Sequence, residues 1–458
     1  MAGLPLTGVH RCSVSNRTHA TMATANPYLP RIIDAELDEL FGSLAAILID
    51  GPKGVGKTAT AARRATSQLQ LDQPAQRDVI AAAPNLLLER PRPLLLDEWQ
   101  RLPVVWDVVR RAVDADRTAG QFLLTGSANP ANPETHSGAG RIVSVRMRPL
   151  ALAERGVTEP SVSLKALLEG GRSPVTGTTS FGLRDYVREI LASGFPGFRH
   201  LNERALRTQL DGYVDRIVDR DFPEMGVAVR RQQTLRRWLM AYAAATSTTA
   251  ALETIRDAAT SDQQDKPARK TTIQYREILE RLFIVDSVPA WMPSRNDIKQ
   301  LTQAPKHQLA DPALVAHLLG LTETSLLDGA PSPVVGLQEI GPRGGVVRDG
   351  SWLGRLFEAL VTLDVRVYAQ AAEAKVRHLR TDSGRREVDL VVVRQDRRVL
   401  ALEVKLGNTI SADDVRHLHW LGEEIGDDLV DAVVIYTGEY AYRRADGIAV
   451  VPAALLGP

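Results

Sequence analysis

The 458-residue chain has a single cysteine, Cys12. One cysteine excludes an internal disulfide framework and a cysteine-based zinc site, and it fits a reducing compartment, so we expect a cytoplasmic protein. No apolar run approaches the roughly 20 residues of a membrane span, and we expect no membrane partner. Residues 1–21 are polar without a sustained apolar stretch, which argues against a secretory signal. We expect 1–25 to be a disordered tail, with either Met1 or Met22 as the true start.

The chain also lacks a net charge of one sign. Fifty-six Lys and Arg against 55 Asp and Glu give a formal charge of +1. No global charge therefore indicates a nucleic-acid partner, and any such surface has to be local. The apolar fraction of 44% and the charged fraction of 24% are ordinary for a soluble globular protein. The length exceeds that of a single core, so we expect about three domains.

A glycine-rich segment, "GPKGVGKTAT" at 51–60, follows the apolar run 44–49. It contains the full pattern G-x-x-x-x-G-K-[ST], in which glycines let backbone N–H groups surround phosphate oxygens. Lys57 then brings its charge to the β- and γ-phosphates, and the Thr58 hydroxyl is a Mg²⁺ ligand. The sequence predicts an ATP site with Mg²⁺. The residues expected to contact the nucleotide are Gly51, Pro52, Lys53, Gly54, Val55, Gly56, Lys57, Thr58 and Ala59.

An acidic pair follows the next apolar run, in "LLLDEW" at 94–99. Asp97 is expected to hold the Mg²⁺ and its waters, and Glu98 to polarise the attacking water as general base. "LLTGSA" at 123–128 ends a further strand, where Thr125 or Ser127 would contact the γ-phosphate or simply end the strand. Arg141 would stabilise charge in the transition state, in cis or across a subunit contact.

Hydrophobic patterning predicts an α/β chain. Strands are expected at 44–50, 93–100 and 121–128, with a helix from the phosphate loop to about Leu71 and another over 103–116. Strands that alternate with helices in this way favour a parallel sheet. A Gly/Ser/Thr-rich stretch at 169–180 reads as a linker or mobile loop. The expected units are a P-loop ATPase domain at 26–180, a helical lid and winged-helix region at 181–310, and an α/β domain at 311–458.

The middle of the chain is predicted to be helical, with strong helices at 204–222 and 231–246. The helix 271–282, followed by "LFIVDSVPAW", resembles that of a winged helix. Winged helices bind DNA or serve as protein-contact modules, and the sequence leaves both open. The side chains that could face a groove are Tyr275, Arg276, Glu280 and Arg281.

Several segments recur in the order found in one family. "YLPRIID", "GPKGVGKT", "LLLDEWQRLP", "LLTGSA" and "AGRI", followed by "APKHQLADPALVAHLLG", "GRLFEALV", "RREVDLVV" and "LALEVKLG", resemble the prokaryotic AAA-family ATPases that end in a nuclease-like domain. The resemblance covers 26–458 and implies roles in ATP chemistry for Lys57, Thr58, Asp97 and Glu98. Lys53 departs from the arginine expected in "GPRQVGKT", which keeps the charge but loses bidentate geometry.

The C-terminal half contains a second group of carboxylates, in "EVDLVVV" at 387–393 and "ALEVKLG" at 401–407. Asp389 and Glu403 lie on successive predicted strands about 4.8 Å apart and could share one divalent ion. Lys405 shares a face with Glu403 and could orient a water. This arrangement resembles the restriction-endonuclease-like D…(E)xK nucleases, in which Glu358 on an earlier helix would be a further ligand. Oxygen ligands favour Mg²⁺ or Mn²⁺ as a second metal. Exposed charges at a strand edge are the alternative interpretation.

Two local basic segments bear on the partner. Between 375 and 398, eight Lys and Arg against four acids give +4, and four arginines lie at 230–237. They would neutralise phosphates or form an ordinary solvated face. The first hypothesis is an ATP-gated, metal-dependent nuclease acting on DNA or RNA, in defence or as a growth-inhibiting toxin-like factor. The second is an ATP-driven switch whose C-terminal domain docks a protein partner, or a second copy, without cutting.

Overall fold

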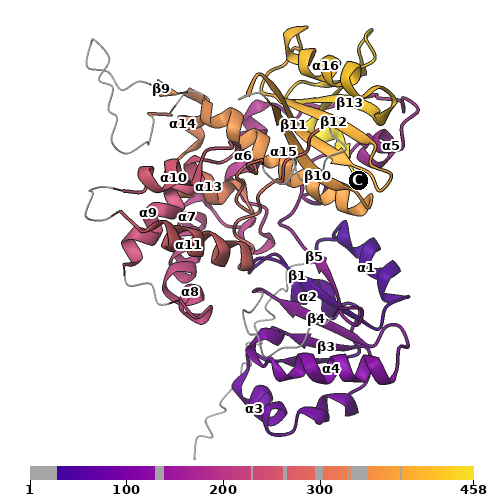
Figure 1. Ribbon diagram of the computed structural model, residues 1–458, viewed down its shortest axis with the longest axis vertical. Coiled ribbons are helices and arrows are strands. Elements are labelled where there is room, and N and C mark those ends of the chain that lie inside the picture. Colours follow the sequence, from indigo (N-terminus) through magenta and orange to yellow (C-terminus); the bar gives the residue numbers. More distant parts are fainter. Residues whose placement is uncertain are drawn as a thin grey trace, which may run out of the picture.

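The computed structural model describes residues 28–128, 139–227, 231–260, 266–293, 303–328, 330–331, 348–349, 351–381 and 384–458. The predicted tail at 1–25 lies outside these residues. Figure 1 shows a small parallel sheet at one end of the molecule, a larger mixed sheet at the other, and a group of helices beside them. The described residues include no helix that is both long and apolar enough to span a membrane.

The N-terminal sheet is parallel, in the order β2-β3-β4-β1-β5. The inner strand β1 pairs with β4 on one side and with the edge strand β5 on the other, so the loop that leaves β1 is flanked by strands on both sides. Apolar strands such as "AILID" and "LLLD" are buried on both faces, as expected for a parallel sheet between helices. The elements are α1 (Ile33–Phe41), β1 (Ala46–Asp50), α2 (Lys57–Ala62), β2 (Ser67–Gln70), α3 (Pro74–Ala82), β3 (Leu94–Asp97), α4 (Val104–Ala115), β4 (Phe122–Gly126) and β5 (Val143–Arg146).

The helix after the phosphate loop is shorter than the sequence indicated. The prediction extended it to about Leu71, whereas α2 ends at Ala62 and residues Ser67–Gln70 form the edge strand β2. β2 pairs in parallel with β3, from Ser67 opposite Leu94 to Gln70 opposite Asp97. The run "TATAARRATSQL" has good helix propensity, but pairing with the buried strand β3 overrides it. The prediction was wrong here because tertiary pairing is not visible in local composition.

The middle of the chain is helical, and its core is aromatic. Trp238 lies against Tyr242 and Tyr275, and Phe222 lies against Tyr275. Tyr275 is only 6% exposed, so the expectation that it faces a nucleic-acid groove is wrong. After α11, Val285 and Val288 pair with Leu309 and Lys306 as isolated antiparallel bridges. The elements are α6 (Leu183–Leu191), α7 (Glu203–Arg216), α8 (Phe222–Glu224), α9 (Gln232–Ala244), α10 (Leu252–Ala258), α11 (Arg269–Arg281), α13 (Pro312–Leu318) and α14 (Glu323–Asp328), with a π-helical turn at Ile217–Asp221 between α7 and α8.

The C-terminal sheet is mixed, in the order β10-β11-β12-β13-β15-β14-β7. The long helix α15 and the short α5 contact one face, and α16 covers the other. Figure 1 shows α15 passing from the helical group to this sheet. The elements are β6 (Val162–Ser163), α5 (Leu164–Glu169), β7 (Gly177–Thr178), α15 (Ser351–Ala371), β10 (Lys375–Thr381), β11 (Arg386–Val393), β12 (Val399–Lys405), α16 (Arg416–Ile425), β13 (Leu429–Tyr436), β14 (Tyr440–Arg443), β15 (Ala449–Pro452) and β16 (Leu456–Gly457), while β8 (Ala330–Pro331) pairs with β9 (Arg348–Asp349).

The predicted boundary at residue 180 does not match the strand pairing. β7 pairs with β14, and β6 pairs with β16. β7 therefore belongs to the C-terminal sheet, and β6 forms a separate two-stranded sheet with β16, although both precede the helical region in sequence. The stretch read as a linker at 169–180 contains β7, which closes one edge of that sheet. Short strands of two residues carry no periodic signal, so the sequence could not have placed them.

Candidate ATP site and the C-terminal carboxylate cluster

The phosphate loop leaves β1 at Asp50 and returns to helix at Lys57. Gly56 has φ +101°, and a Cβ on Gly51 would lie 2.2 Å from the Met147 carbonyl oxygen, so both positions require glycine. The Lys57 ammonium donates to the carbonyls of Gly51 and Pro52, each at 2.9 Å. Burial lowers the pKa of Lys57 to about 8, with the charges of Glu98 and Asp97 opposing the shift. The loop thus holds a buried cation where polyphosphate would bind.

The two predicted magnesium ligands lie together. The Thr58 hydroxyl donates to Asp97 Oδ1 at 2.7 Å, and the Thr125 hydroxyl donates to the same oxygen. Asp97 ends β3 and Thr125 lies on the adjacent β4, so the sheet brings them together. Burial raises the pKa of Asp97, and the two hydroxyls counter that shift. Hydroxyl and carboxylate oxygens at this spacing are the donor set that Mg²⁺ takes.

Glu98 is held in an unusual conformation. Its φ of +55° is left-handed, a conformation that costs a non-glycine residue on the order of 1–3 kcal/mol. Its backbone N–H donates to Thr125 Oγ1 at 3.1 Å, while Ser127 Oγ donates to its carboxylate at 2.8 Å and Gln100 donates to the same oxygen. The Glu98 carboxylate thus has hydrogen-bond partners of its own, distinct from the hydroxyls that contact Asp97. Thr125 and Ser127 therefore contact the acidic pair, so they do more than end the strand, and a contact with the γ-phosphate stays a prediction.

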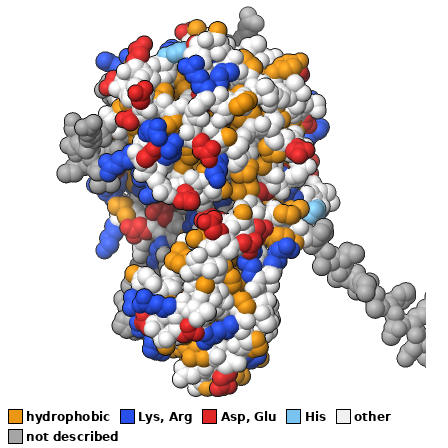
Figure 2. Space-filling model, turned by 90° about the vertical axis from the view of Figure 1, so that its right-hand side faces the viewer, with side chains coloured by type: hydrophobic (Ala, Val, Ile, Leu, Met, Phe, Trp, Pro, Cys, Tyr) orange, Lys and Arg blue, Asp and Glu red, His pale blue; other side chains and the backbone are white. Residues whose placement is uncertain are grey.

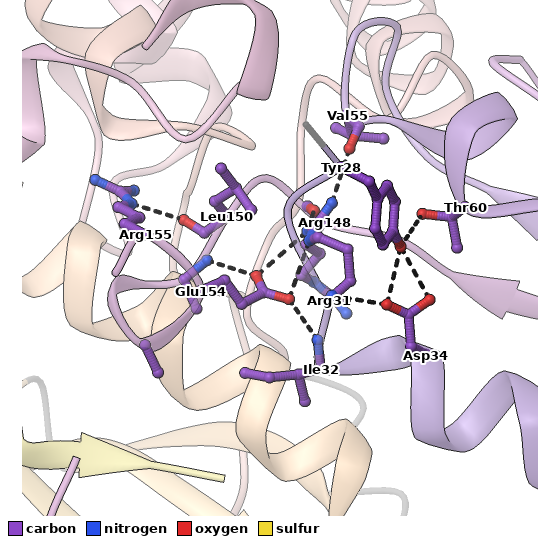
Figure 3. A network of polar contacts seen from close by, with 12 residues as sticks. Tyr28, Arg31, Ile32, Asp34, Val55, Thr60, Arg148, Leu150, Glu154 and Arg155 are labelled. Carbon is purple, nitrogen blue, oxygen red and sulfur yellow. Dashed lines mark hydrogen bonds and ion pairs between the residues drawn. The ribbon is translucent and has the colours of Figure 1, made fainter. Parts of the chain in front are cut away.

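Arg31, in the segment before α1, holds the phosphate loop through hydrogen bonds (Figure 3). Arg31 donates to the carbonyls of Val55 at 2.8 Å and Arg148 at 2.7 Å, and pairs with Glu154 at 3.0 Å. Its side chain is 3% exposed, and its partner's 2%. The guanidinium therefore ties the phosphate loop to the segment that follows β5, and a buried pair with satisfied donors fixes this geometry.

A hollow of about 180 Å³ lies on one side of the phosphate loop. Tyr28 and His200 contribute to its wall, and Val55 and Ala59 form its floor. The Tyr28 hydroxyl lies 3.0 Å from Thr60 Oγ1 on α2 and 2.9 Å from Asp34, as Figure 3 shows. Aromatic and apolar walls with a few polar groups are typical of a pocket for a planar base. Sequence reasoning missed Tyr28 and His200, because nothing local relates them to the loop.

Arg141 does not lie at the phosphate edge of its own sheet. It precedes β5, which runs parallel to β1, so it lies at the opposite, amino edge and pairs with Asp114 at 2.8 Å. The in-cis role expected for it is wrong, and a role across a subunit contact stays a prediction. Arg146, at the carboxyl end of the same strand, is 3.7 Å from Asp50 and 3.8 Å from the Phe283 ring centroid. It is the arginine of β5 that the strand direction places beside the loop.

The C-terminal carboxylates converge, but on a lysine. Lys306 is 1% exposed, and its ammonium lies 2.8 Å from Glu358, 3.2 Å from Asp389 and 3.5 Å from Glu387. Burial alone would lower the pKa of Lys306, but the three carboxylates outweigh it and raise that pKa. Among the described residues, no three His, Cys, Asp or Glu are placed to hold a metal ion. An ammonium group therefore offsets the carboxylate charge where a divalent ion was expected, and a second metal at this cluster stays a prediction.

Glu403 and Lys405 lie beside this cluster and pair with each other at 2.8 Å. The other oxygen of Glu403, Oε2, is buried without a hydrogen-bond partner. Burial raises the pKa of Glu403 to about 8, with the charge of Asp389 acting in the same direction. Asp389 itself accepts the backbone N–H of Val404 at 3.0 Å, which fixes β11 against β12. The strand geometry expected from the sequence is confirmed, since Leu390 is opposite Leu402.

The two basic segments are largely engaged within the chain. Arg380 donates to Thr249, Arg394 to the Leu168 carbonyl, and Arg386 lies over the Trp420 ring. Arg236, in the other segment, pairs with Asp215; residue 230 lies outside the described residues. On the face in Figure 2, basic and acidic side chains alternate and form no continuous basic surface. A nucleic-acid partner stays a prediction.

Comparisons with known proteins match three separate parts of the chain. Residues 44–155 match the family described as an AAA domain, residues 183–325 match a domain of unknown function, DUF8612, and residues 353–456 match another, DUF4143. The chain is similar to an uncharacterized protein of Mycobacterium bovis and one of Mycobacterium tuberculosis, each 26% identical over 420 residues, 89% of this chain and 80% of the relative. The AAA match spans Lys57, Asp97, Glu98 and Thr125, and so supports ATP binding by the N-terminal sheet.

Proposed function

We propose that the protein is a Mg²⁺-dependent ATPase that acts as a nucleotide-driven switch. The observation that carries the proposal is the joint placement of Thr58, Asp97 and Thr125, with Glu98 held separately by Ser127 and Gln100. One set of oxygens would bind Mg²⁺, and a separate carboxylate, with its own partners, lies next to it in sequence. A phosphate loop that only bound nucleotide would not need the second group.

The residues around the phosphate loop suggest on which side the base and on which side the phosphates of a bound nucleotide would lie. The base would enter the hollow between Tyr28 and His200, next to Ala59. Lys57 would neutralise the β- and γ-phosphates from within the loop. When bound, Mg²⁺ supplies positive charge to the phosphate oxygens. Glu98 would accept a proton from the water that attacks the γ-phosphorus, and Ser127 would keep its carboxylate aimed at that water.

Loss of the loop cation tests this proposal. Lys57→Ala removes the buried ammonium that offsets phosphate charge, so we expect the full chain to lose tight ATP binding and turnover. Binding of a fluorescent ATP analogue and Mg²⁺-dependent phosphate release are the measurements. Exposed Lys165→Ala on α5 is the control and should behave as the parent. A Lys57→Ala chain that hydrolyses ATP at the parental rate would remove the basis of the proposal.

For the C-terminal domain, we propose a docking role for a protein partner in place of catalysis. The observation that favours it is Lys306, whose ammonium lies where the carboxylates would otherwise gather a metal ion. An ATP-coupled nuclease that acts on DNA or RNA, in defence or as a toxin-like factor, is the second candidate. Its support is the unpartnered Oε2 of Glu403 beside Asp389 and Lys405, the D…ExK set of the sequence.

A divalent-ion titration separates these two roles. With the ammonium in place we expect no change in melting temperature with Mg²⁺ or Mn²⁺ in the absence of nucleotide, and no cleavage of DNA or RNA. A bound ion at a hundredfold excess over its Kd would instead add about 2.7 kcal/mol of stability. A Mn²⁺-dependent rise that Asp389→Asn abolishes, together with cleavage, would establish the nuclease.

A further inference from the structure

One ion pair joins the phosphate loop to the helical region. The ammonium of Lys53 lies 2.5 Å from Asp221 Oδ1, across 168 positions of the chain. The Asp221 side chain is 5% exposed and that of Lys53 is 29% exposed. The Tyr213 hydroxyl on α7 donates to the Lys53 carbonyl at 3.1 Å, so backbone and side chain of the same loop residue contact the same helical segment. Two contacts therefore join this loop residue to the segment from α7 to Asp221.

Asp221 ends the π-helical turn Ile217–Asp221. Such turns insert one extra residue into a helix and are frequent at functional sites. Asp221 is buried at this turn, while its neighbour Asp219 is 47% exposed at the side chain and pairs with Arg236 at the surface. A second pair, Arg101 with Glu224 at 2.9 Å, ties the turn after β3 to α8. Both ion pairs join the edge of the parallel sheet that carries the phosphate loop to the segment from α7 to α8.

The pair lies at the γ-phosphate end of the site. A small hollow there is lined by Lys53 and Asp221 together with Gln100 and Ser127. Gln100 and Ser127 are the residues that hold the Glu98 carboxylate, which has to face the γ-phosphorus to act as base. The hollow lined by Tyr28 and Ala59 lies on the other side of the loop. Lys53 would therefore lie within reach of the part of the nucleotide that distinguishes ATP from ADP.

We propose that Asp221 and the γ-phosphate compete for the Lys53 ammonium. This inference rests on the proposed ATPase function and names how nucleotide state would reach the rest of the chain. Two anions facing one cation repel each other, and a buried carboxylate that loses its cation is strongly disfavoured where it stands. Arrival of ATP draws Lys53 to the γ-phosphate and frees Asp221 with the segment α7–α8. Hydrolysis and loss of the γ-phosphate restore the pair.

Neutralising the carboxylate tests the competition in the full chain. Asp221→Asn leaves Lys53 free, so binding of a non-hydrolysable ATP analogue should tighten about tenfold, the size of one charge-assisted hydrogen bond, while ADP binding is unchanged. Adding Lys53→Met to Asp221→Asn should reverse that gain for the ATP analogue alone. Asp219→Asn, on the same turn, is the matched control and should leave the ratio of the two affinities unchanged. An unchanged ratio between Asp221→Asn and the double variant would show that Lys53 does not contact the γ-phosphate.

The parent protein provides a test that needs no variant. Backbone amides of 213–224 should exchange faster with solvent in the ATP-analogue complex than in the ADP complex, because the pair is open in the former. In Asp221→Asn the two complexes should exchange alike. Equal exchange in both complexes of the parent would overturn the switch while leaving ATP hydrolysis intact. Absence of ATP binding by the parent would instead overturn the proposed function and this inference with it.

Discussion

Glu98→Gln should leave ATP binding intact and slow hydrolysis by about 10²-fold or more, the scale of a lost general base. Glutamine keeps the shape of the side chain and can still accept from Ser127, but its amide cannot take a proton from water. Thr58 and Asp97, the residues proposed to bind Mg²⁺, are untouched, so affinity for Mg²⁺-ATP should stay at the parental value. Single-turnover hydrolysis and analogue binding separate the two effects.

Two further variants sharpen this result. Ser127→Ala removes the hydroxyl that holds Glu98 Oε2 and should give a smaller loss, because the carboxylate is still present but less well aimed. Glu89→Gln, at an exposed position in the same domain, should hydrolyse ATP like the parent. Parental turnover by Glu98→Gln would show that another group accepts the proton, and the left-handed turn at Glu98 would then need a different explanation.

The candidate ATP site was predictable because its residues lie close together in sequence or at the ends of recognisable strands. A short sequence motif determines the geometry here. The spacing from Gly51 to Thr58 specifies the phosphate loop, and the end of a buried strand specifies where the two carboxylates lie. Residues whose position depends on topology were not predictable. The choice between Arg141 and Arg146 depends on which end of β5 lies beside the loop, and that follows only from the parallel pairing with β1. Asp221 was missed for the same reason, since nothing near it in sequence indicates a contact with Lys53.

The C-terminal cluster shows a different limit. The sequence correctly placed Asp389 and Glu403 on adjacent strands and Glu358 on the preceding helix. It missed Lys306, which enters from the segment before α13, 83 positions before Asp389. Lysine is almost never fully buried unless it is paired, so a lone lysine in "PKHQLAD" reads as a surface residue. The pattern of carboxylates required a cation, and the chain supplies one from outside the pattern.

Lys306→Met should therefore destabilise the C-terminal sheet by about 3–5 kcal/mol, as when one partner of a buried ion pair is removed. Methionine fills a similar volume, so the loss would come from leaving Glu358, Glu387 and Asp389 without their cation. Amide hydrogen exchange over β11 and β12 measures this region, and retained ATP hydrolysis would show that the N-terminal domain is intact. Exposed Lys375→Met on β10 is the control and should have little effect.

Restoring the charge balance should restore the sheet. Glu358→Gln in the Lys306→Met background removes one carboxylate that has lost its cation. Burial raises the pKa of Glu358 to about 7. The double variant should therefore recover part of the hydrogen-exchange protection that Lys306→Met loses. Mn²⁺ should protect the Lys306→Met chain but not the parent, because only the variant presents several carboxylates without a cation among them. Full protection in Lys306→Met without added ion would show that these carboxylates are neutral in the folded protein, and that the ammonium is not what holds them together.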